Sequence, residues 1–309
     1  MDSFNQIHPP KVAPPYGTIL DELRAGDAIP FLGAWASRVG WSKGAPDFLP
    51  SGGDLAEMLA RDSRFPSADD HDIQDLAKVA SYYADGSSRI ALRRRLRGVF
   101  TGAPHASNDL HRMLAQIANN LMIVTTNYDT LLEQAFQEAG KPYDLAVYPA
   151  DNTTYGNALL WWPHGALKPQ PIRANDFDIA DLSRTNIIYK IHGSVRHEEA
   201  SWDSFVITEE DYVKFLSQMS TAVPPAFRQY FSSRAFLFLG YGLRDWNMRV
   251  LLKQVKEFKK KTESEKVSWA ILKEPSIFET KLWLRRNVDM FDLTLEEFVG
   301  EMRLEIGRR

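Results

Sequence analysis

The segment LMIVTTNYD, residues 121–129, contains a strong strand signal and the polar residues that follow it. Its apolar and β-branched run is preceded by Asn119 and Asn120, and this pattern is typical of a strand buried on both faces of a parallel sheet. Asn127 and Asp129 come at its carboxyl end, just before a segment of helical period. A strand that leads through a polar turn into a helix is the repeating unit of a doubly wound α/β protein.

Three further segments of the chain have the same form. Apolar runs at residues 28–32, 187–191 and 236–239 each end in a polar or glycine-rich turn, at residues 33–37, 192–194 and 240–245. The carboxyl ends of parallel strands meet at one edge of a sheet, where such proteins bind their ligands. We therefore predict an α/β fold with a doubly wound, Rossmann-like parallel sheet, helices on both faces and one ligand site built from all four turns.

The remaining sequence surrounds this sheet. Residues 1–16 contain four prolines and are expected to form an extended N-terminal arm. Residues 17–309 are expected to form a single Rossmann-type domain. Between about residues 54 and 119 the apolar residues recur with helical period and no strand interrupts them, which predicts a helical insertion. The insertion carries a basic cluster, Arg93-Arg94-Arg95 with Arg97, which is either a solvated helix face or a contact for phosphate or nucleic acid.

The composition excludes several classes of protein. The chain has 309 residues, of which 44% are hydrophobic and 25% charged, as in soluble globular proteins. The absence of cysteine excludes zinc–thiolate modules, iron–sulfur clusters and a thiol nucleophile. A net charge of −3 gives no basic field for nucleic acid, and no apolar run is long enough for a membrane span or a signal peptide. We expect a cytoplasmic protein with no membrane association and no direct nucleic-acid binding.

Two of the four turns are rich in small residues. Gly33, Ala34, Ala36 and Ser37 would let the backbone pass close to a ligand and offer N–H groups to phosphate oxygens, or they form a tight structural turn. Trp35 is a bulky residue in the middle of this turn. The second turn contains Gly240, Tyr241 and Gly242, again as a close-approach loop or a plain turn between strand and helix.

The other two turns carry side chains suited to catalysis. Asn127 is a candidate for positioning a water or a ribose hydroxyl, and Asp129 either accepts a bond from a sugar hydroxyl or caps the next helix. His192 lies at a strand end on the same edge as Asn127 and is a candidate general base. Such placement is lacking for His105, His111, His164 and His197, and we assign no metal.

Five motifs in this order resemble a known family. They are PFLGAWAS (30–37), IVTTNYDTLLEQAF (123–136), YKIHGSV (189–195), FVITEEDYVKFL (205–216) and FLFLGYGLRDWNMRVLL (236–252). Together they resemble the sirtuin-like (silent information regulator-like) domain family, and particularly its prokaryotic branch used in antiphage defence. The resemblance covers about residues 29–252.

The resemblance implies roles for individual residues. The first motif implies that Gly33, Ala34, Ala36 and Ser37 cradle the pyrophosphate of NAD. The second motif implies that the nicotinamide and ribose pocket is lined by Thr125, Thr126, Asn127 and Asp129. The third motif implies that His192 is the catalytic histidine. The last implies that Gly240, Tyr241 and Gly242 meet the adenosine side.

The resemblance also implies a reaction. Sirtuin deacylases carry a four-cysteine zinc module that this chain lacks, so the expected activity is that of the defence branch. This activity is hydrolysis of NAD at the nicotinamide–ribose bond, which gives nicotinamide and ADP-ribose and depletes cellular NAD when the effector is activated. Asn127 and His192 are the expected catalytic residues, NAD is the substrate and no metal is required. Trp35 stands where the family usually has glycine. The site is therefore open to three interpretations: it is narrowed by the indole, it is inactive, or it depends on activation.

Two alternatives remain open from the sequence. If the chain does not hydrolyse NAD, it is a non-catalytic NAD or ADP-ribose sensor, or an oligomeric scaffold for a partner DNA-translocating ATPase. In the scaffold, Trp161-Trp162 and the proline-rich arm are interface candidates, although buried core explains the tryptophans equally well. Because unchecked NAD cleavage is toxic, homo-oligomerisation or a regulatory partner is expected. The family analogy suggests a HerA-type ATPase, a prokaryotic Argonaute or another sensor as that partner.

Overall fold

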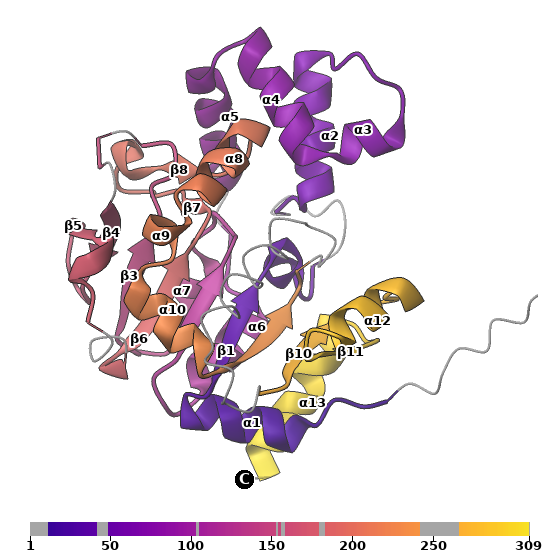
Figure 1. The fold of residues 1–309 in the computed structure, drawn as a ribbon, viewed down its shortest axis with the longest axis vertical. Helices are drawn as coiled ribbons and strands as arrows, with labels where there is room; N and C mark the ends of the chain where they lie inside the picture. The colour runs from indigo at the N-terminus through magenta and orange to yellow at the C-terminus, as the bar shows by residue number, and fades with distance from the viewer. Residues whose placement is uncertain are drawn as a thin grey trace, which may run out of the picture.

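The computed structural model describes residues 12–41, 49–102, 105–152, 154–155, 158–178, 183–241 and 266–308 (Figure 1). Within these residues the main sheet has nine strands in the order β11-β10-β9-β1-β2-β6-β3-β4-β5. The strands are β1 (Ala28–Leu32), β2 (Met122–Thr125), β3 (Tyr143–Val147), β4 (Ala158–Trp162), β5 (Gln170–Arg173), β6 (Asn186–Lys190), β9 (Ala235–Leu239), β10 (Ser268–Ile271) and β11 (Val288–Phe291). All pairs from β11 to β3 are parallel, whereas β4 and β5 add an antiparallel edge. A second, small sheet pairs β7 (Gly193–Ser194) with β8 (Ser204–Phe205).

Helices cover both faces of the sheet, because successive residues of a strand point to opposite faces. On β1, Phe31 belongs to the apolar core on one face and Leu32 to the core on the other. The first core is packed by α8 (Glu209–Ser217), α9 (Met219–Ala222), α10 (Pro225–Ser232) and α12 (Ile277–Leu284). The second is packed by α1 (Tyr16–Ala25), α6 (Asp109–Gln116), α7 (Leu131–Glu138) and α13 (Leu295–Arg308). The predicted α/β fold with helices on both faces of a mostly parallel sheet is confirmed.

A group of helices lies beyond the carboxyl ends of the strands, at the top of Figure 1. It consists of α2 (Gly52–Ser63), α3 (Asp70–Gln74), α4 (Leu76–Gly86) and α5 (Arg89–Thr101). These helices share a third apolar core, which also takes in Tyr128, from the turn after β2, and Phe205, from β8. The helix group therefore packs directly on the turns that follow the sheet. Among the helices of the described residues, none has both the length and the apolar character needed to cross a lipid bilayer.

The structure corrects some of the expectations from the sequence, and other expectations concern residues that the structure does not describe. The antiparallel edge was not predicted. The turn that was expected at residues 33–37, after β1, is a short 3-10 helix, η1 (Ala34–Arg38). Trp161 and Trp162 are buried on β4, so the core interpretation of this pair is correct and the interface interpretation is wrong. Most of the predicted arm, residues 1–11, and the turn and helix from Gly242 onward lie outside the described residues.

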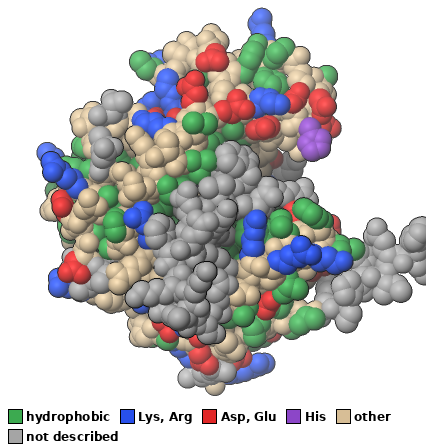
Figure 2. All heavy atoms as spheres, in the orientation of Figure 1, with side chains coloured by type: hydrophobic (Ala, Val, Ile, Leu, Met, Phe, Trp, Pro, Cys, Tyr) green, Lys and Arg blue, Asp and Glu red, His purple; other side chains and the backbone are tan. Residues whose placement is uncertain are grey.

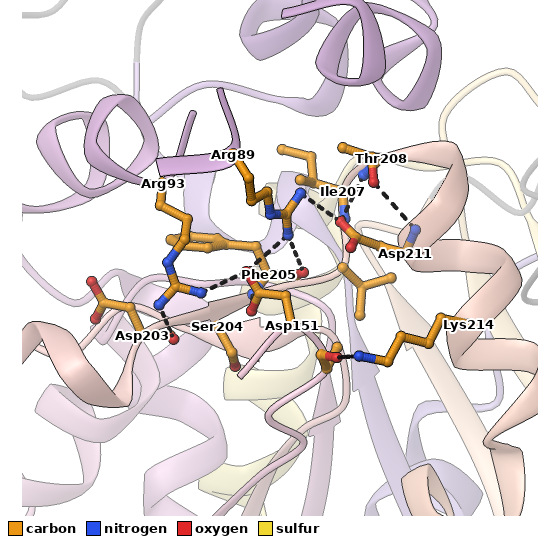
Figure 3. Close-up of polar contacts among 12 residues, drawn as sticks. Arg89, Arg93, Asp151, Asp203, Ser204, Phe205, Ile207, Thr208, Asp211 and Lys214 are labelled. Carbon is orange, nitrogen blue, oxygen red and sulfur yellow. Dashed lines mark hydrogen bonds and ion pairs between the residues drawn. The ribbon is translucent and has the colours of Figure 1, made fainter. Parts of the chain in front are cut away.

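Arginines of α5 connect the helix group to the rest of the protein (Figure 3). Arg89 pairs with Asp151, which lies beyond β3, at 2.9 Å and with Asp211, on α8, at 2.8 Å. Arg93 pairs with the same Asp151 at 2.6 Å and donates a hydrogen bond to the Asp203 carbonyl at 2.7 Å. These side chains are partly buried, where ion pairs are screened less than at the surface. The network fixes α5 against α8 and the turns of the sheet.

This network revises the interpretation of the basic cluster. Arg97 pairs with Asp203 at 2.7 Å, so Arg93 and Arg97 both face carboxylates of the protein. For these two residues, neither a solvated face nor a phosphate contact is correct. Arg94 is exposed and Arg95 forms a half-exposed pair with Asp62, as expected of a solvated helix face.

The turns after β1 and β9 approach each other so closely that both need glycine. An added Cβ at Gly33 would lie 2.5 Å from the Gly240 carbonyl oxygen, and one at Gly240 would lie 2.3 Å from the Ala36 nitrogen. Gly240 also has a φ of +67°, which glycine adopts readily and other residues rarely do. The Trp35 amide donates a hydrogen bond to the Gly240 carbonyl at 3.1 Å. These contacts hold the two turns together at the edge of the sheet.

Gly33→Ala tests this close approach. We expect the added methyl group to reduce the free energy of unfolding by about 1–3 kcal/mol, the usual cost of overpacking, as measured by urea denaturation. Gly98→Ala is the matched control, because Gly98 lies in α5 with no atom within 4 Å of an added Cβ and alanine should stabilise the helix by up to about 1 kcal/mol. A Gly33→Ala protein as stable as the wild type would contradict the structure at this turn.

The N-terminus of α6 supports the same turn from the other side. The Asn108 side chain donates to the Ala36 carbonyl at 2.8 Å and accepts the amide of His111 at 3.2 Å. The His111 Nδ1 in turn accepts the Asn108 amide. Burial lowers the pKa of His111 to about 4, so its imidazole is neutral at pH 7 and serves as an acceptor.

The pH dependence of stability should report this buried histidine. An unfolded imidazole has a pKa of about 6.5, so between that value and about 4 the unfolded chain binds more protons than the folded one. The contribution of His111 is present above about pH 6.5 and is lost as the pH falls toward 4, by up to about 3 kcal/mol. His111→Gln, which keeps an acceptor at this capping position, should flatten the profile of unfolding free energy between about pH 4 and 7. An unchanged profile would contradict the assignment.

Candidate functional site

A cavity of about 290 Å³ lies at the carboxyl ends of β1, β2, β6 and β9, between the sheet and the helix group. This volume is slightly below the range of about 300–1,000 Å³ that is usual for small-molecule sites. Its lining residues come from all four predicted turns, from the helix group and the segment just before it, and from α8: Ala34, Trp35, Ser37, Leu49, Pro50, Ser51, Gly52, Leu55, Leu76, Phe100, Thr126, Asn127, Tyr128, Asp129, His192, Tyr212, Gly240 and Tyr241. This position is where a doubly wound sheet binds its ligands.

Most of the predicted site residues line this cavity. They are Ala34, Ser37, Thr126, Asn127, Asp129, His192, Gly240 and Tyr241. Gly33 and Ala36 lie behind the wall, where their carbonyl oxygens accept hydrogen bonds from Asn127 and Asn108. Thr125 supports the next turn, because its hydroxyl accepts the Asn127 amide at 3.0 Å. Gly242 lies outside the described residues.

The Asn127 carboxamide has one orientation in this site. Its Nδ2 donates to the Gly33 carbonyl at 3.0 Å and to the Ser37 hydroxyl at 2.9 Å. A carbonyl oxygen can only accept, so the NH2 group of the amide must face Gly33. What Asn127 offers to a ligand or a water molecule is therefore its oxygen, Oδ1, which is an acceptor.

Ser37 and Asp129 continue this chain of hydrogen bonds. The Ser37 hydroxyl donates to Asp129 Oδ2 at 2.8 Å, and Asp129 Oδ1 accepts the Leu131 amide at 3.1 Å. Asp129 therefore contacts the first residue of α7 as expected, although the capping position itself is Thr130. An ionised carboxylate has about four acceptor sites, so Asp129 retains capacity for a sugar hydroxyl.

The β1 turn differs from the expected cradle of free backbone amides. The Gly33 amide donates to the Leu239 carbonyl, the Trp35 amide to Gly240 and the Ala36 amide to Gly33. The Ala36 bond is part of the 3-10 helix, and the Gly33 and Trp35 bonds result from the close approach of this turn to the end of β9. A phosphate at this turn would have to compete with protein acceptors for those three amides.

His192 is placed by β6 and α8. Its ring is 5% exposed and stands edge-on to Tyr212 at 5.6 Å and to Phe215 at 5.3 Å between ring centroids. Such T-shaped contacts restrain the position and tilt of the imidazole ring. Because Arg89 binds Asp211, the residue before Tyr212, the arginine network of Figure 3 also braces the helix that holds His192.

Lys190 is a buried residue that supports the candidate site and that sequence analysis missed. It is fully buried at the end of β6, its ammonium lies 2.9 Å from Glu133 Oε1, and it donates to the Asp129 carbonyl. A buried ammonium persists only when it is paired and hydrogen-bonded. Lys190 therefore fastens the turn that carries Asn127 to the strand that precedes His192. The signal in the sequence was a lysine at the end of an apolar strand, two residues before that histidine.

The helix group gives the cavity an apolar wall that the sequence did not predict. Leu55, Leu76 and Phe100 come from three different helices and face the polar turns. A site with one apolar wall and a few convergent polar groups suits a planar ring attached to a sugar. Among the described residues, no group of three or more His, Asp or Glu side chains comes together as a metal site.

Comparisons with known proteins agree with this architecture. A family model described as the SIR2-like domain matches residues 121–291, more than half of the chain. The NAD(+) hydrolase ThsA of Enterococcus faecium is 26% identical over 240 residues, which are 76% of this chain and 41% of that protein. ThsA of Cytobacillus dafuensis is 26% identical over 182 residues, 59% of this chain and 30% of the relative.

A third relative has a name that refers to defence. Defense-associated sirtuin 2 of Bacillus subtilis is 23% identical over 154 residues, which are 50% of this chain and 12% of that protein. The matched part is less than half the length of each of these relatives. The family match, together with the mostly parallel sheet and the cavity at its carboxyl edge, shows that the chain belongs to the SIR2-like domain family and resembles its defence-associated members.

Proposed function

We propose that the chain hydrolyses NAD at the nicotinamide–ribose bond and releases nicotinamide and ADP-ribose. The observation that carries this proposal is the convergence of Asn127, from the β2 turn, and His192, from the β6 turn, on one cavity. Relatives named NAD(+) hydrolase support NAD as the substrate. In the cell the chain would act as an antiphage-defence effector that depletes NAD once activated, as a homo-oligomer or with a partner protein such as a HerA-type ATPase.

The reaction makes modest demands on the enzyme. The bond between the anomeric carbon and the pyridinium nitrogen breaks, and its electron pair neutralises the leaving nicotinamide. The transition state resembles an oxocarbenium ion. The protein has to hold the ribose, exclude bulk water and place one water molecule.

The site residues fit these tasks. Asn127 Oδ1 accepts one hydrogen of the water and thereby turns an oxygen lone pair toward the anomeric carbon. The His192 imidazole accepts a proton from this water, or from a ribose hydroxyl, as the new C–O bond forms. Asp129 accepts a ribose hydroxyl while its bond to Ser37 keeps it in place. The apolar wall receives the nicotinamide ring.

Asn127→Ala and His192→Ala should each reduce nicotinamide release from NAD by at least about 100-fold, which is typical of a misplaced reactant for Asn127 and of a lost acid–base group for His192. Release is measured by chromatography, with thermal unfolding as a check of the fold. The controls are Asn152→Ala and His164→Ala, since neither residue lines the cavity. Full activity in both site variants would refute the assignment.

The same experiment separates the alternatives. If the wild type releases no nicotinamide, a calorimetric titration with ADP-ribose distinguishes them. Binding without turnover favours a sensor or an enzyme awaiting its partner, whereas no binding favours an oligomeric scaffold.

A further inference from the structure

Trp35 is the residue at which the chain departs from the family pattern. Its side chain is 56% exposed and lines the cavity, and no other exposed large hydrophobic side chain of the described residues does so. Tryptophan is usually largely buried, and Trp161, Trp162, Trp269 and Trp283 of this chain are. An exposed indole in the wall of a cavity is a surface for a ligand.

The indole is held in place on one side. The Arg38 guanidinium lies over the ring at 4.3 Å from its centroid, within the range of a cation–π contact. Arg38 is itself 8% exposed and paired with Asp54, which also forms the capping box at the start of α2. The Trp35 backbone is bonded to Gly240. With one face covered by Arg38, the exposed area of the indole belongs to its other face and its edges.

We propose that this free face stacks on the adenine ring of the dinucleotide, and that Trp35 is therefore a specificity-determining residue of the site. The assignment rests on the proposed NAD hydrolase function. It also explains how the β1 turn contributes to binding although its Gly33, Trp35 and Ala36 amides are bonded within the protein. The turn supplies a flat aromatic surface.

The proposed function leaves adenine as the stacked ring. It places the nicotinamide ring against Leu55, Leu76 and Phe100 of the helix group, so adenine is the ring of the dinucleotide that remains for the indole. Adenine is flat and neutral, and its π-face stacks readily on an aromatic side chain.

Three ligands test the inference by calorimetric titration: ADP-ribose and AMP, which contain adenine, and nicotinamide mononucleotide, which contains only the pyridinium ring. Trp35→Ala should weaken binding of ADP-ribose and AMP by about tenfold or more, the typical effect of removing one stacked base. Binding of nicotinamide mononucleotide should change by less than about twofold.

Trp35→Phe, which keeps a ring, should recover most of the affinity. Trp202→Phe, outside the cavity lining, is the matched control and should resemble the wild type.

Several outcomes would overturn the inference. They are unchanged affinity for ADP-ribose in Trp35→Ala, a larger loss for nicotinamide mononucleotide than for AMP, or no binding of any of the three ligands by the wild type. Failure of the proposed function is a separate result. A wild type that binds ADP-ribose through Trp35 and never cleaves NAD would refute hydrolysis and support the stacking role.

Discussion

The hydroxyl group of Ser37 joins the two turns on which the site depends. It accepts a hydrogen bond from Asn127 and donates one to Asp129, so the turn after β1 and the turn after β2 become one rigid unit. Because Asn127 is oriented by this hydroxyl and by the Gly33 carbonyl, its oxygen is the atom presented to a ligand. Lys190 extends the unit to β6 by binding the Asp129 carbonyl. The relative positions of Asn127 and His192 are thereby set by buried contacts of the protein itself.

The cavity is formed by the sheet and the helix group together. The sheet provides the polar turns, and the helix group provides Leu55, Leu76 and Phe100 as the opposite wall. The sheet and the helix group are held together by the third apolar core and by the ion pairs of Arg89 and Arg93. A movement of α5 would therefore reach the site directly, because Phe100 lies on the same helix as these arginines. Enzymes that need control commonly place part of the active site on an element that can move.

The sequence predicted the sheet and its site edge well, for a physical reason. A strand buried on both faces of a parallel sheet is largely apolar, so the apolar runs at residues 28–32, 187–191 and 236–239 stood out, and the polar residues after them were expected to meet at one edge. What it did not predict depends on contacts between distant residues. The helical period of α5 showed which face was apolar, but Arg93 and Asp151 are 58 residues apart and only the fold brings them together. Likewise, the 3-10 helix at Ala34–Arg38 follows from the proximity of Gly240, a residue that is close in space and distant in the sequence.

The most direct test of the central claim is a crystal structure of the His192→Ala protein with NAD. The account predicts that the dinucleotide occupies the cavity with the nicotinamide–ribose bond between Asn127 and the position of the missing imidazole. The ribose should contact Asp129, and the nicotinamide ring should lie against the wall formed by Leu55, Leu76 and Phe100. A dinucleotide bound elsewhere, or one whose nicotinamide end points away from Asn127, would contradict the assignment of this cavity as the site of NAD cleavage.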